Sequence, residues 1–392
     1  MIRGVEDLDL KDKTVFLRVD FNVPIEQGKV TESHRIDSAL PTIRLILNRA
    51  KKLVIGSHLG RPDGKIVPKY SLAPVHDYLA RSLQESVLLA PDCVGPGVEQ
   101  ITRDPRSRTI LLENLRFHKE EEENDPEFSK ALAALADVYI NDAFGAAHRA
   151  HASIAGMAAF FKQKGAGLLL QKELDYLSGL LWNPQKPFVT ILGGAKVSDK
   201  IGVIRNLLPK VNTLLIAGGM AYTFLKAKGI DIGKSLLEAD KVSLAKELLD
   251  GAAEHGVATF LPVDHITGDA NKKNPMVCTG NIPPERIGLD IGPRTVEQFS
   301  RELKKARMAL WNGPVGLFEV EPYSEGTRAL AQTLADCRSS LVSIIAGGDT
   351  VAAVTAAGVA NQITHLSTGG GATLEFLEGR ELPGIKALEE TA

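Results

Sequence analysis

Four segments in the first half of the chain place charged and polar side chains directly after runs of apolar residues. In an open parallel sheet, ligands bind beyond the carboxyl ends of the strands. The arginines of these segments, together with Arg35 and up to three histidines, would face one crevice, and an anion would compensate that charge. The pattern therefore favours a small, multiply charged substrate. The segments are Arg18–Asn22, Ser57–Arg61, Glu113–Phe117 and Asn141–Gly145, the last followed by Ala147–His151.

Each of these residues also has a simpler interpretation. A single arginine at a strand end is often a salt-bridge partner, and Asp20 and Asn22 are common turn formers. Four arginines at successive strand ends favour the ligand-binding interpretation instead. His148 and His151 are three residues apart, but no third ligand is evident, so we predict no metal there.

Apolar runs in the second half of the chain end in glycine-containing segments, four of which have adjacent glycines. Glycine lets a ligand approach main-chain N–H groups, and a helix that begins just afterwards adds favourable partial charge for phosphate oxygens. Each segment alone is compatible with a tight turn, whereas five of them predict a nucleotide site. They lie in Ile191–Lys196, Ile216–Gly219, Trp311–Gly316, Ala346–Thr350 and Ser367–Gly371.

Two lysines and one aspartate in or next to these segments could bind the phosphates and the Mg²⁺ of a nucleotide. On a helix that starts after Gly193-Gly194, Lys196 and Lys200 would share a face and reach a phosphate chain, unless both are simply solvated. Asp349 is a suitable ligand for Mg²⁺ carried by a nucleotide, or an ordinary helix N-cap.

The elements that must position these residues alternate between short strands and helices. Strands that are continuously apolar are buried on both faces, as in a parallel sheet covered by helices. We therefore predict an α/β fold with two Rossmann-like, doubly wound parallel-sheet domains (αβα sandwiches) joined by a hinge helix. The predicted strands are Thr14–Val19, Leu53–Gly56, Val87–Leu89, Thr109–Leu112, Val138–Ile140, Phe188–Leu192, Thr213–Ala217, Thr259–Leu261, Met308–Trp311 and Leu341–Ala346.

A length of 392 residues also favours two large domains. Leu170, Leu174, Leu177 and Leu181 have the spacing of an amphipathic helix that Asn183-Pro184 ends. We predict domains over 1–169 and 184–381, with 170–183 as the helix that connects them. The acidic cluster at 119–123 is predicted to be a solvated loop or the start of a helix.

Composition excludes several classes of protein. The chain has 46 Lys and Arg against 48 Asp and Glu, a net charge of −2, so we expect neither nucleic acid nor a membrane as partner. Its three cysteines (Cys93, Cys278 and Cys337) form no CxxC pair, which fits a reducing, cytoplasmic setting. The charged N-terminus is not typical of a secretory signal, and no segment is predicted to span a membrane.

Eight motifs occur in the order in which phosphoglycerate kinases carry them, and the chain resembles that family over essentially its full length. One small departure is Ala346, where many relatives carry a third glycine. The motifs are RVDFNVP (18–24), SHLGRP (57–62), LLENLRF (111–117), NDAFGAAHRAH (141–151), LGGAKVSDK (192–200), WNGPVGLFE (311–319), AGGDT (346–350) and STGGGA (367–372).

The resemblance implies a kinase that reversibly transfers the acyl phosphate of 1,3-bisphosphoglycerate to ADP, with Mg²⁺, in glycolysis. It also implies that residues 382–392 pack back on the first domain. The residues implied to hold the phosphoglycerate are Asp20, Phe21, Asn22, Arg35, His58, Leu59, Gly60, Arg61, Arg116 and Arg149. Those implied to contact the nucleotide are Gly194, Ala195, Lys196, Lys200, Gly218, Gly219, Asn312, Pro314, Gly316, Glu319, Gly347, Gly348, Asp349 and Thr350, with Asp349 toward magnesium.

The transfer itself requires no proton movement, because the nucleophile is an ionised phosphate oxygen and the leaving group is a carboxylate. We expect catalysis by positioning and by charge compensation from Arg35, Lys200 and Lys196, with N–H groups from Gly370 and Gly371. Substrates on separate domains can meet only if the domains close, with Glu173 as a candidate anchor. A single chain supplies both sets of residues, so a monomer is expected.

Two alternative functions have different requirements. An amino-acid or carbamate kinase would need acidic partners for an amine in the first half, where arginines dominate. A nucleotide-binding regulator without catalytic activity would need the glycine segments but not the arginines.

Overall fold

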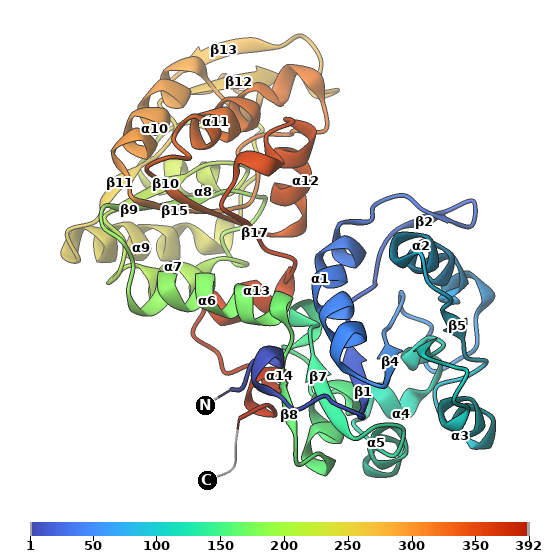
Figure 1. Ribbon diagram of the computed structural model, residues 1–392. Helices are drawn as coiled ribbons and strands as arrows, with labels where there is room; N and C mark the ends of the chain where they lie inside the picture. Colours follow the sequence, from blue (N-terminus) through green and yellow to red (C-terminus); the bar gives the residue numbers. More distant parts are fainter. Residues whose placement is uncertain (1, 390–392) are drawn as a thin grey trace. The chain divides into compact units, whose positions relative to one another are not determined.

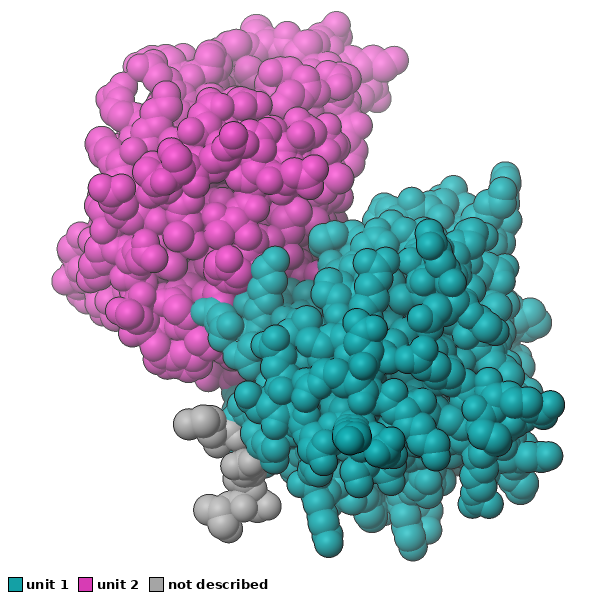
Figure 2. Space-filling view, viewed as in Figure 1, with its two compact units in different colours: residues 1–175, 381–392 teal, residues 176–380 magenta. Residues whose placement is uncertain are grey.

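The computed structural model describes residues 2–389 of the chain. Two compact units form, one of residues 1–175 and 381–392 and the other of residues 176–380 (Figure 2). The chain passes from unit 1 to unit 2 within helix α6 (Leu168–Trp182), the helix that the leucine spacing predicts. No helix in the described range is both long and apolar enough to cross a bilayer.

Unit 1 is built on a six-stranded parallel sheet with the strand order β5-β6-β4-β1-β7-β8 (Figure 1). Leu17 on the central strand pairs with Ile55 on one side and Ile140 on the other, and all three are fully buried. The strands are β1 (Thr14–Arg18), β4 (Lys52–Gly56), β5 (Leu88–Leu89), β6 (Thr109–Leu111), β7 (Val138–Asn141) and β8 (Lys164–Ala166).

Helical periodicity and capping explain the helices of unit 1. Ile36, Ile43 and Ile46 lie on one face of α1 and join the core formed by the sheet. The side chain of Asp125 accepts a hydrogen bond from Phe128 N and caps α5, which begins with Pro126. The helices are α1 (His34–Arg49), α2 (Ala73–Leu83), α3 (Pro96–Arg103), α4 (Lys119–Glu122), α5 (Pro126–Ala133) and α14 (Pro383–Lys386).

Unit 2 contains a second six-stranded parallel sheet, in the order β11-β10-β9-β15-β16-β17. Helices α7 and α9 lie on one side of this sheet and α10, α11 and α12 on the other (Figure 1). Phe299 and Leu330 from that second layer pack with Trp311 in the core. The strands are β9 (Phe188–Leu192), β10 (Thr213–Ile216), β11 (Ala258–Phe260), β15 (Met308–Asn312), β16 (Val342–Ala346) and β17 (His365–Leu366).

The remaining elements of unit 2 connect these strands or extend them. The helices are α7 (Ile201–Leu207), α8 (Ala221–Ala227), α9 (Val242–Glu254), α10 (Pro293–Lys305), α11 (Glu325–Asp336), α12 (Gly348–Ala356) and α13 (Gly371–Leu377). A small antiparallel sheet pairs β12 (Asp264–Gly268) with β13 (Met276–Thr279) and β14 (Ile287–Ile291). In unit 1, β2 (Ile25–Glu26) and β3 (Lys29–Val30) form a short hairpin.

The α/β fold with two parallel-sheet units confirms the predicted fold class, and the ten predicted strands all form with shifts of one residue at most. The edge strands β8 and β17 were not predicted because each is only two or three residues long. The sheet of β12, β13 and β14 was also not predicted, since polar residues interrupt any apolar run in β12.

The end of the chain belongs to unit 1. Gly384 N donates a hydrogen bond to Ala147 O at 2.8 Å, and a Cβ on Gly384 would lie 2.6 Å from a side-chain carbon of Ile154. Leu388 is fully buried. The last three residues of the predicted tail, 390–392, lie outside the described residues.

One prediction about charge is wrong in part. The acidic cluster does start a helix, α4, but Glu121 is fully buried instead of solvated. Its carboxylate accepts hydrogen bonds from the Ser153 backbone N–H at 2.9 Å and the Ser153 hydroxyl at 2.5 Å, and it lies 4.0 Å from the guanidinium of Arg18. A buried carboxylate needs such partners because it has lost its water.

Candidate active site

The strand order of unit 1 brings the cationic segments to one edge of its sheet. Strands β6, β4, β1 and β7 are neighbours and all parallel, so the residues that follow them lie along the same carboxyl edge. Asn114 joins two of the loops: its side chain accepts from Leu59 N at 3.2 Å and donates to Leu59 O at 2.7 Å. The Asn114 side-chain oxygen that accepts from Leu59 N also accepts from Arg116 N, and so caps the turn that carries this arginine.

Asp20, Asn22 and Arg35 form one hydrogen-bonded group. Arg35 donates to an Asp20 carboxylate oxygen at 2.8 Å and to the Asn22 carbonyl oxygen at 3.3 Å. The other Asp20 oxygen accepts from Asn22 N, and the Asn22 side chain accepts from Gly60 N at 2.9 Å. The loops after β1 and β4 are thereby held together, while a third of the Arg35 side chain stays exposed for a further partner.

His58 lies buried among guanidinium groups. Burial and the positive charges of Arg18, Arg116, Arg149 and Arg35 hold the pKa of His58 well below its usual range. Arg18 NH2 lies 3.3 Å from the Nδ1 atom of this ring. The imidazole is therefore neutral at pH 7, and the cluster carries its positive charge on arginines alone.

Arg116 is itself almost completely buried. Burial, together with the charge of Arg149, lowers the pKa of Arg116 to about 10, although Glu122 lies 3.3 Å from its Nε atom. One guanidinium nitrogen donates to Gly60 O at 2.8 Å. An anion stabilises positively charged guanidinium groups that lie close together in a partly buried site. An anion is therefore the kind of ligand that this edge of the sheet can bind.

The other residues expected at this edge differ in which of their atoms a ligand could contact. The side chains of Phe21 and Leu59 are buried in the core, so only their main chains remain for a ligand, and Phe21 N already donates to Ser57 Oγ. Arg61 is exposed and Arg149 is partly exposed.

In unit 2, three glycine loops at the carboxyl edge pack backbone against backbone. A Cβ on Gly193 would lie 2.2 Å from Pro314 O, and one on Gly313 would lie 2.3 Å from Gly193 O. Gly218 has a φ of +65°, and its Cβ would lie 2.7 Å from Gly194 N. These glycines are required so that the loops after β9, β10 and β15 can approach one another.

Other glycines at the same edge face open space. Built Cβ atoms on Gly194, Gly348 and Gly370 would meet no atom within 4 Å. Gly348 begins α12, so the backbone N–H groups of that first turn have no intrahelical acceptor. Main-chain donors in open space at a helix start are suited to phosphate oxygens.

The polar side chains of this edge form a connected group. Lys200 donates to the Asn312 side-chain oxygen, and the Asn312 amide donates to Ala346 O at 2.9 Å. The hydroxyl of Thr350 accepts from Gly313 N at 2.7 Å. Burial lowers the pKa of Lys200, while the charges of Asp199, Asp349 and Glu378 raise it. Pro314 and Gly316 are partly buried nearby in the chain, and Glu319 is exposed.

The predicted helix carrying Lys196 and Lys200 does not form. α7 begins only at Ile201, with Lys200 as its N-cap residue, and Lys196 lies exposed in the preceding loop. Gly194 has a φ of +91°, and the Glu238 carboxylate accepts from Val197 N and from the Ser198 hydroxyl. These interactions hold the loop open, so the two lysines do not share a helical face.

Comparison with known proteins assigns the chain to a family. The family model for phosphoglycerate kinase matches residues 5–380. The chain belongs to the phosphoglycerate kinase family. A phosphoglycerate kinase from Koribacter versatilis (strain Ellin345) is 54% identical over 400 residues, which cover 98% of each chain. The structure of phosphoglycerate kinase from Coxiella burnetii matches with a TM-score of 0.88 at 43% identity over 99% of each chain.

A more distant relative has the same fold. The crystal structure of phosphoglycerate kinase from Pyrococcus horikoshii OT3 matches with a TM-score of 0.85 at 34% identity, over 99% of this chain and 98% of that one. The predicted resemblance is confirmed, and with it the enzyme class: the chain is a phosphoglycerate kinase family enzyme that transfers phosphate.

Several supporting residues of this kinase site were missed by sequence reasoning. Arg18 stands in a predicted motif, but only the fold shows that it is fully buried and supports His58. Glu238 holds the loop before α7 and lies 40 residues away from it in sequence. Leu236 is 48% exposed beside Gly219 and Ala195, and offers an apolar contact. No sequence motif marks the last two.

The buried histidines of the kinase fold make its stability depend on pH. Burial, and then the charges of Arg116, Arg18 and Arg149, lower the pKa of His151 to about 3, against about 6.5 in an unfolded chain. Its stabilising contribution is present above pH 6.5 and is lost as pH falls toward 3, at no more than about 1.4 kcal/mol per pH unit. In urea unfolding at pH 7 and pH 5, His151→Gln should lose less stability on acidification than the wild type. An equal loss in both proteins would contradict the assignment.

Proposed function

We propose that this chain catalyses the reversible transfer of the acyl phosphate of 1,3-bisphosphoglycerate to ADP, giving 3-phosphoglycerate and ATP. The observation that carries the proposal is the group of four arginines around a neutral, buried His58 in a chain of this family. A phosphorylated three-carbon acid bears negative charge at both ends, and it matches a concentration of guanidinium groups at one edge of the sheet.

Unit 1 is proposed to bind the phosphoglycerate. Arg35, Arg116 and Arg149 supply charge, and Asp20 and Asn22 fix the direction of Arg35 while offering polar contacts of their own. The exposed Arg61 and the main chain of the Gly60 loop are further contacts. His58 contributes a neutral polar ring.

Unit 2 is proposed to bind the nucleotide. The N–H groups at the start of α12 and in the loop of Gly370 and Gly371 are the proposed donors for phosphate oxygens, and Gly194 leaves open space beside them, although its own N–H donates to Pro314 O. Lys200 supplies a buried positive charge that Asn312 orients. Lys196 is exposed and can reach outward, and Leu236 with Gly219 offers an apolar surface for the base.

The residues at the start of α12 fit a magnesium ion that arrives with the nucleotide. Asp349 is an exposed carboxylate in the first turn of the helix, and its charge acts on Lys200. Mg²⁺ usually takes one or two carboxylates, phosphate oxygens and several waters, so one exposed carboxylate beside phosphate-binding loops is suitable. Bound there, the ion would neutralise phosphate charge.

Catalysis is proposed to rest on positioning and charge compensation. The attacking phosphate oxygen and the departing carboxylate are both ionised, so no general base is needed. Arg35, Lys200 and the N–H groups at Gly370 and Gly371 would stabilise charge on the transferring phosphoryl group. Exclusion of water protects the acyl phosphate from hydrolysis.

Closure of two domains completes the mechanism. With 1–169 holding the phosphoglycerate and 184–381 holding the nucleotide, the reactants meet only after movement at 170–183, with Glu173 as an anchor. We place this reaction in glycolysis, in the cytoplasm and in a monomer, because one chain carries both groups of residues.

Assay of the purified chain tests the reaction. With 1,3-bisphosphoglycerate and ADP, a coupled assay should detect ATP, and a magnesium chelator should abolish the rate. ATP-dependent phosphorylation of an amino acid or carbamate instead would identify a different carboxylate kinase. Nucleotide binding without turnover of any of these would identify a regulator.

Arg35→Ala should lower kcat by about 100-fold or more, since a charge-stabilising donor is removed from the reacting groups. Arg44→Ala is the matched control, because Arg44 is an exposed arginine of the same helix. Steady-state kinetics of both variants measure the effect. A near-normal kcat for Arg35→Ala would remove this residue from the catalytic group.

Small-angle X-ray scattering tests closure and oligomeric state together. The radius of gyration should decrease when 3-phosphoglycerate and Mg-nucleotide are both present, and decrease less with either alone. The forward scattering should give the mass of one chain. Unchanged dimensions with both ligands would argue against closure, and twice the mass would argue against a monomer.

A further inference from the structure

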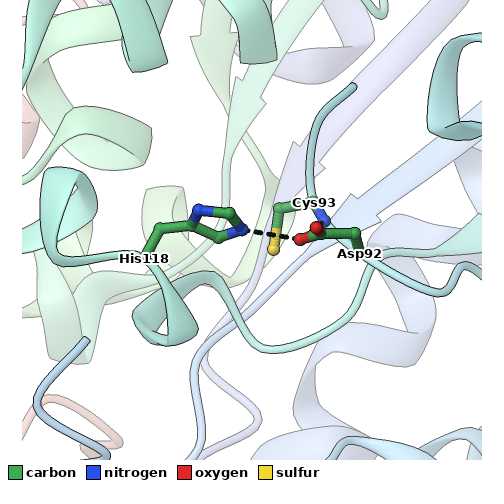
Figure 3. Close-up of side chains that lie close together, drawn as sticks. All are labelled: Asp92, Cys93 and His118. Carbon is green, nitrogen blue, oxygen red and sulfur yellow. Dashed lines mark hydrogen bonds and ion pairs between the residues drawn. The ribbon is translucent and has the colours of Figure 1, made fainter. Parts of the chain in front are cut away.

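Three metal-binding side chains come together at the edge of unit 1, outside the proposed substrate group. Asp92 and Cys93 lie in the loop after β5, and His118 follows the turn Leu115–Phe117. One ligand atom from each lies within 4.8 Å of the other two, and the three side chains point toward one another (Figure 3). Within the described part of the chain, no other group of three histidine, cysteine or acidic side chains meets this spacing.

The three side chains are held in place by contacts of their own. His118 Nε2 lies 2.6 Å from Asp92 Oδ1, and that oxygen also accepts from Cys93 N at 2.6 Å. Cys93 Sγ donates to Glu113 O at 2.9 Å. The His118 ring lies 5.1 Å from the ring of Phe128, which limits its rotation. The site is therefore largely formed before any ion arrives.

We propose that Asp92, Cys93 and His118 bind a zinc-class divalent cation through the Cys93 thiolate, His118 Nε2 and one Asp92 oxygen. Sulfur, imidazole nitrogen and carboxylate oxygen are the ligands that Zn²⁺ takes, and three protein ligands leave a fourth position for water. In a tetrahedral site the ligand atoms lie about 3.5 Å apart. The present separations, from 2.6 Å up to 4.8 Å, need shifts of about 1 Å to reach that value.

Charge at the site balances when the ion binds. Burial, and then the charges of Asp92, Glu121 and Glu113, raise the pKa of the Cys93 thiol, so it is protonated without metal. The same carboxylates attract a cation. On binding, the thiol proton leaves to solvent, and the His118 Nε2 proton that Asp92 accepts moves through solvent to Nδ1, which breaks that hydrogen bond. The metal bonds to sulfur, Nε2 and the carboxylate oxygen then form. Thiolate and carboxylate then neutralise the two positive charges of the ion.

An ion can reach the site from one side. The Asp92 side chain is 46% exposed and the His118 side chain 26%, while Cys93 is fully buried. Zinc would enter past the carboxylate and imidazole and bind the sulfur last, with its water ligand facing out. The competing interpretation is an ion pair that fixes two loops next to an inert buried thiol.

Spectroscopy of the full-length chain loaded with Co²⁺, a substitute for Zn²⁺, separates these interpretations. The reduced, metal-free protein titrated with Co²⁺ should develop a thiolate-to-cobalt charge-transfer band. Cys93→Ser should lose this band, because the serine hydroxyl keeps a donor for Glu113 O but provides no thiolate. Cys278→Ser and Cys337→Ser, which alter the other two cysteines, should keep it.

Competition for Zn²⁺ with a chromophoric chelator gives the affinity without any activity measurement. The wild type should bind one ion tightly, and Cys93→Ser and His118→Gln should each bind at least about tenfold more weakly. His118→Gln changes a partly exposed side chain and so keeps the test valid if the serine variant does not fold. The absence of a charge-transfer band, its survival in Cys93→Ser, or equal zinc affinity in all variants would overturn the proposal.

Discussion

The buried pair of Arg18 and Glu121 is the constraint on which the edge of unit 1 depends. Both side chains are fully buried, and they lie 4.0 Å apart with Ser153 bound to each of them. A buried charge without a partner costs several kcal/mol, so removal of either residue would leave the other uncompensated. Arg18 ends the central strand and also contacts His58. The pair therefore fixes the positions of the strand end and of His58, next to which the more exposed arginines lie.

The two units offer anions different kinds of contact. Unit 1 concentrates guanidinium groups, which form strong and directional bonds to carboxylate and phosphate oxygens. Unit 2 instead presents glycine loops and the start of α12, where main-chain N–H groups have no intrahelical acceptor. Its glycines also divide into two kinds, since Gly193 and Gly313 allow loops to pack, whereas Gly194 and Gly348 border open space. Only the second kind is free to face a ligand, and the sequence alone does not distinguish them.

Local patterns predicted the strands and the two sheets because burial on both faces leaves a continuous apolar run, and the spacing of four leucines predicted the helix over 170–183. The same approach placed Asp20, Asn22, Arg35 and Arg116 near one edge, since parallel strands share a carboxyl end. It failed where contacts distant in sequence decide the conformation. The Glu238 carboxylate accepts hydrogen bonds from the loop that contains Lys196, and the Glu121 carboxylate accepts a hydrogen bond from Ser153 N. Asp92 and His118 meet across 26 residues, and no pattern within either segment indicates that contact.

The neutral state of the buried histidines is consistent with a transfer that moves no proton. His58 and His151 have pKa values far below neutrality, since burial and surrounding guanidinium groups oppose a further positive charge. A general acid or base works best with a pKa near the operating pH, and neither ring meets that condition. Both rings can still form hydrogen bonds and fill space among the arginines. Their environment therefore favours a positioning role, and it leaves charge compensation to groups that stay ionised at every physiological pH.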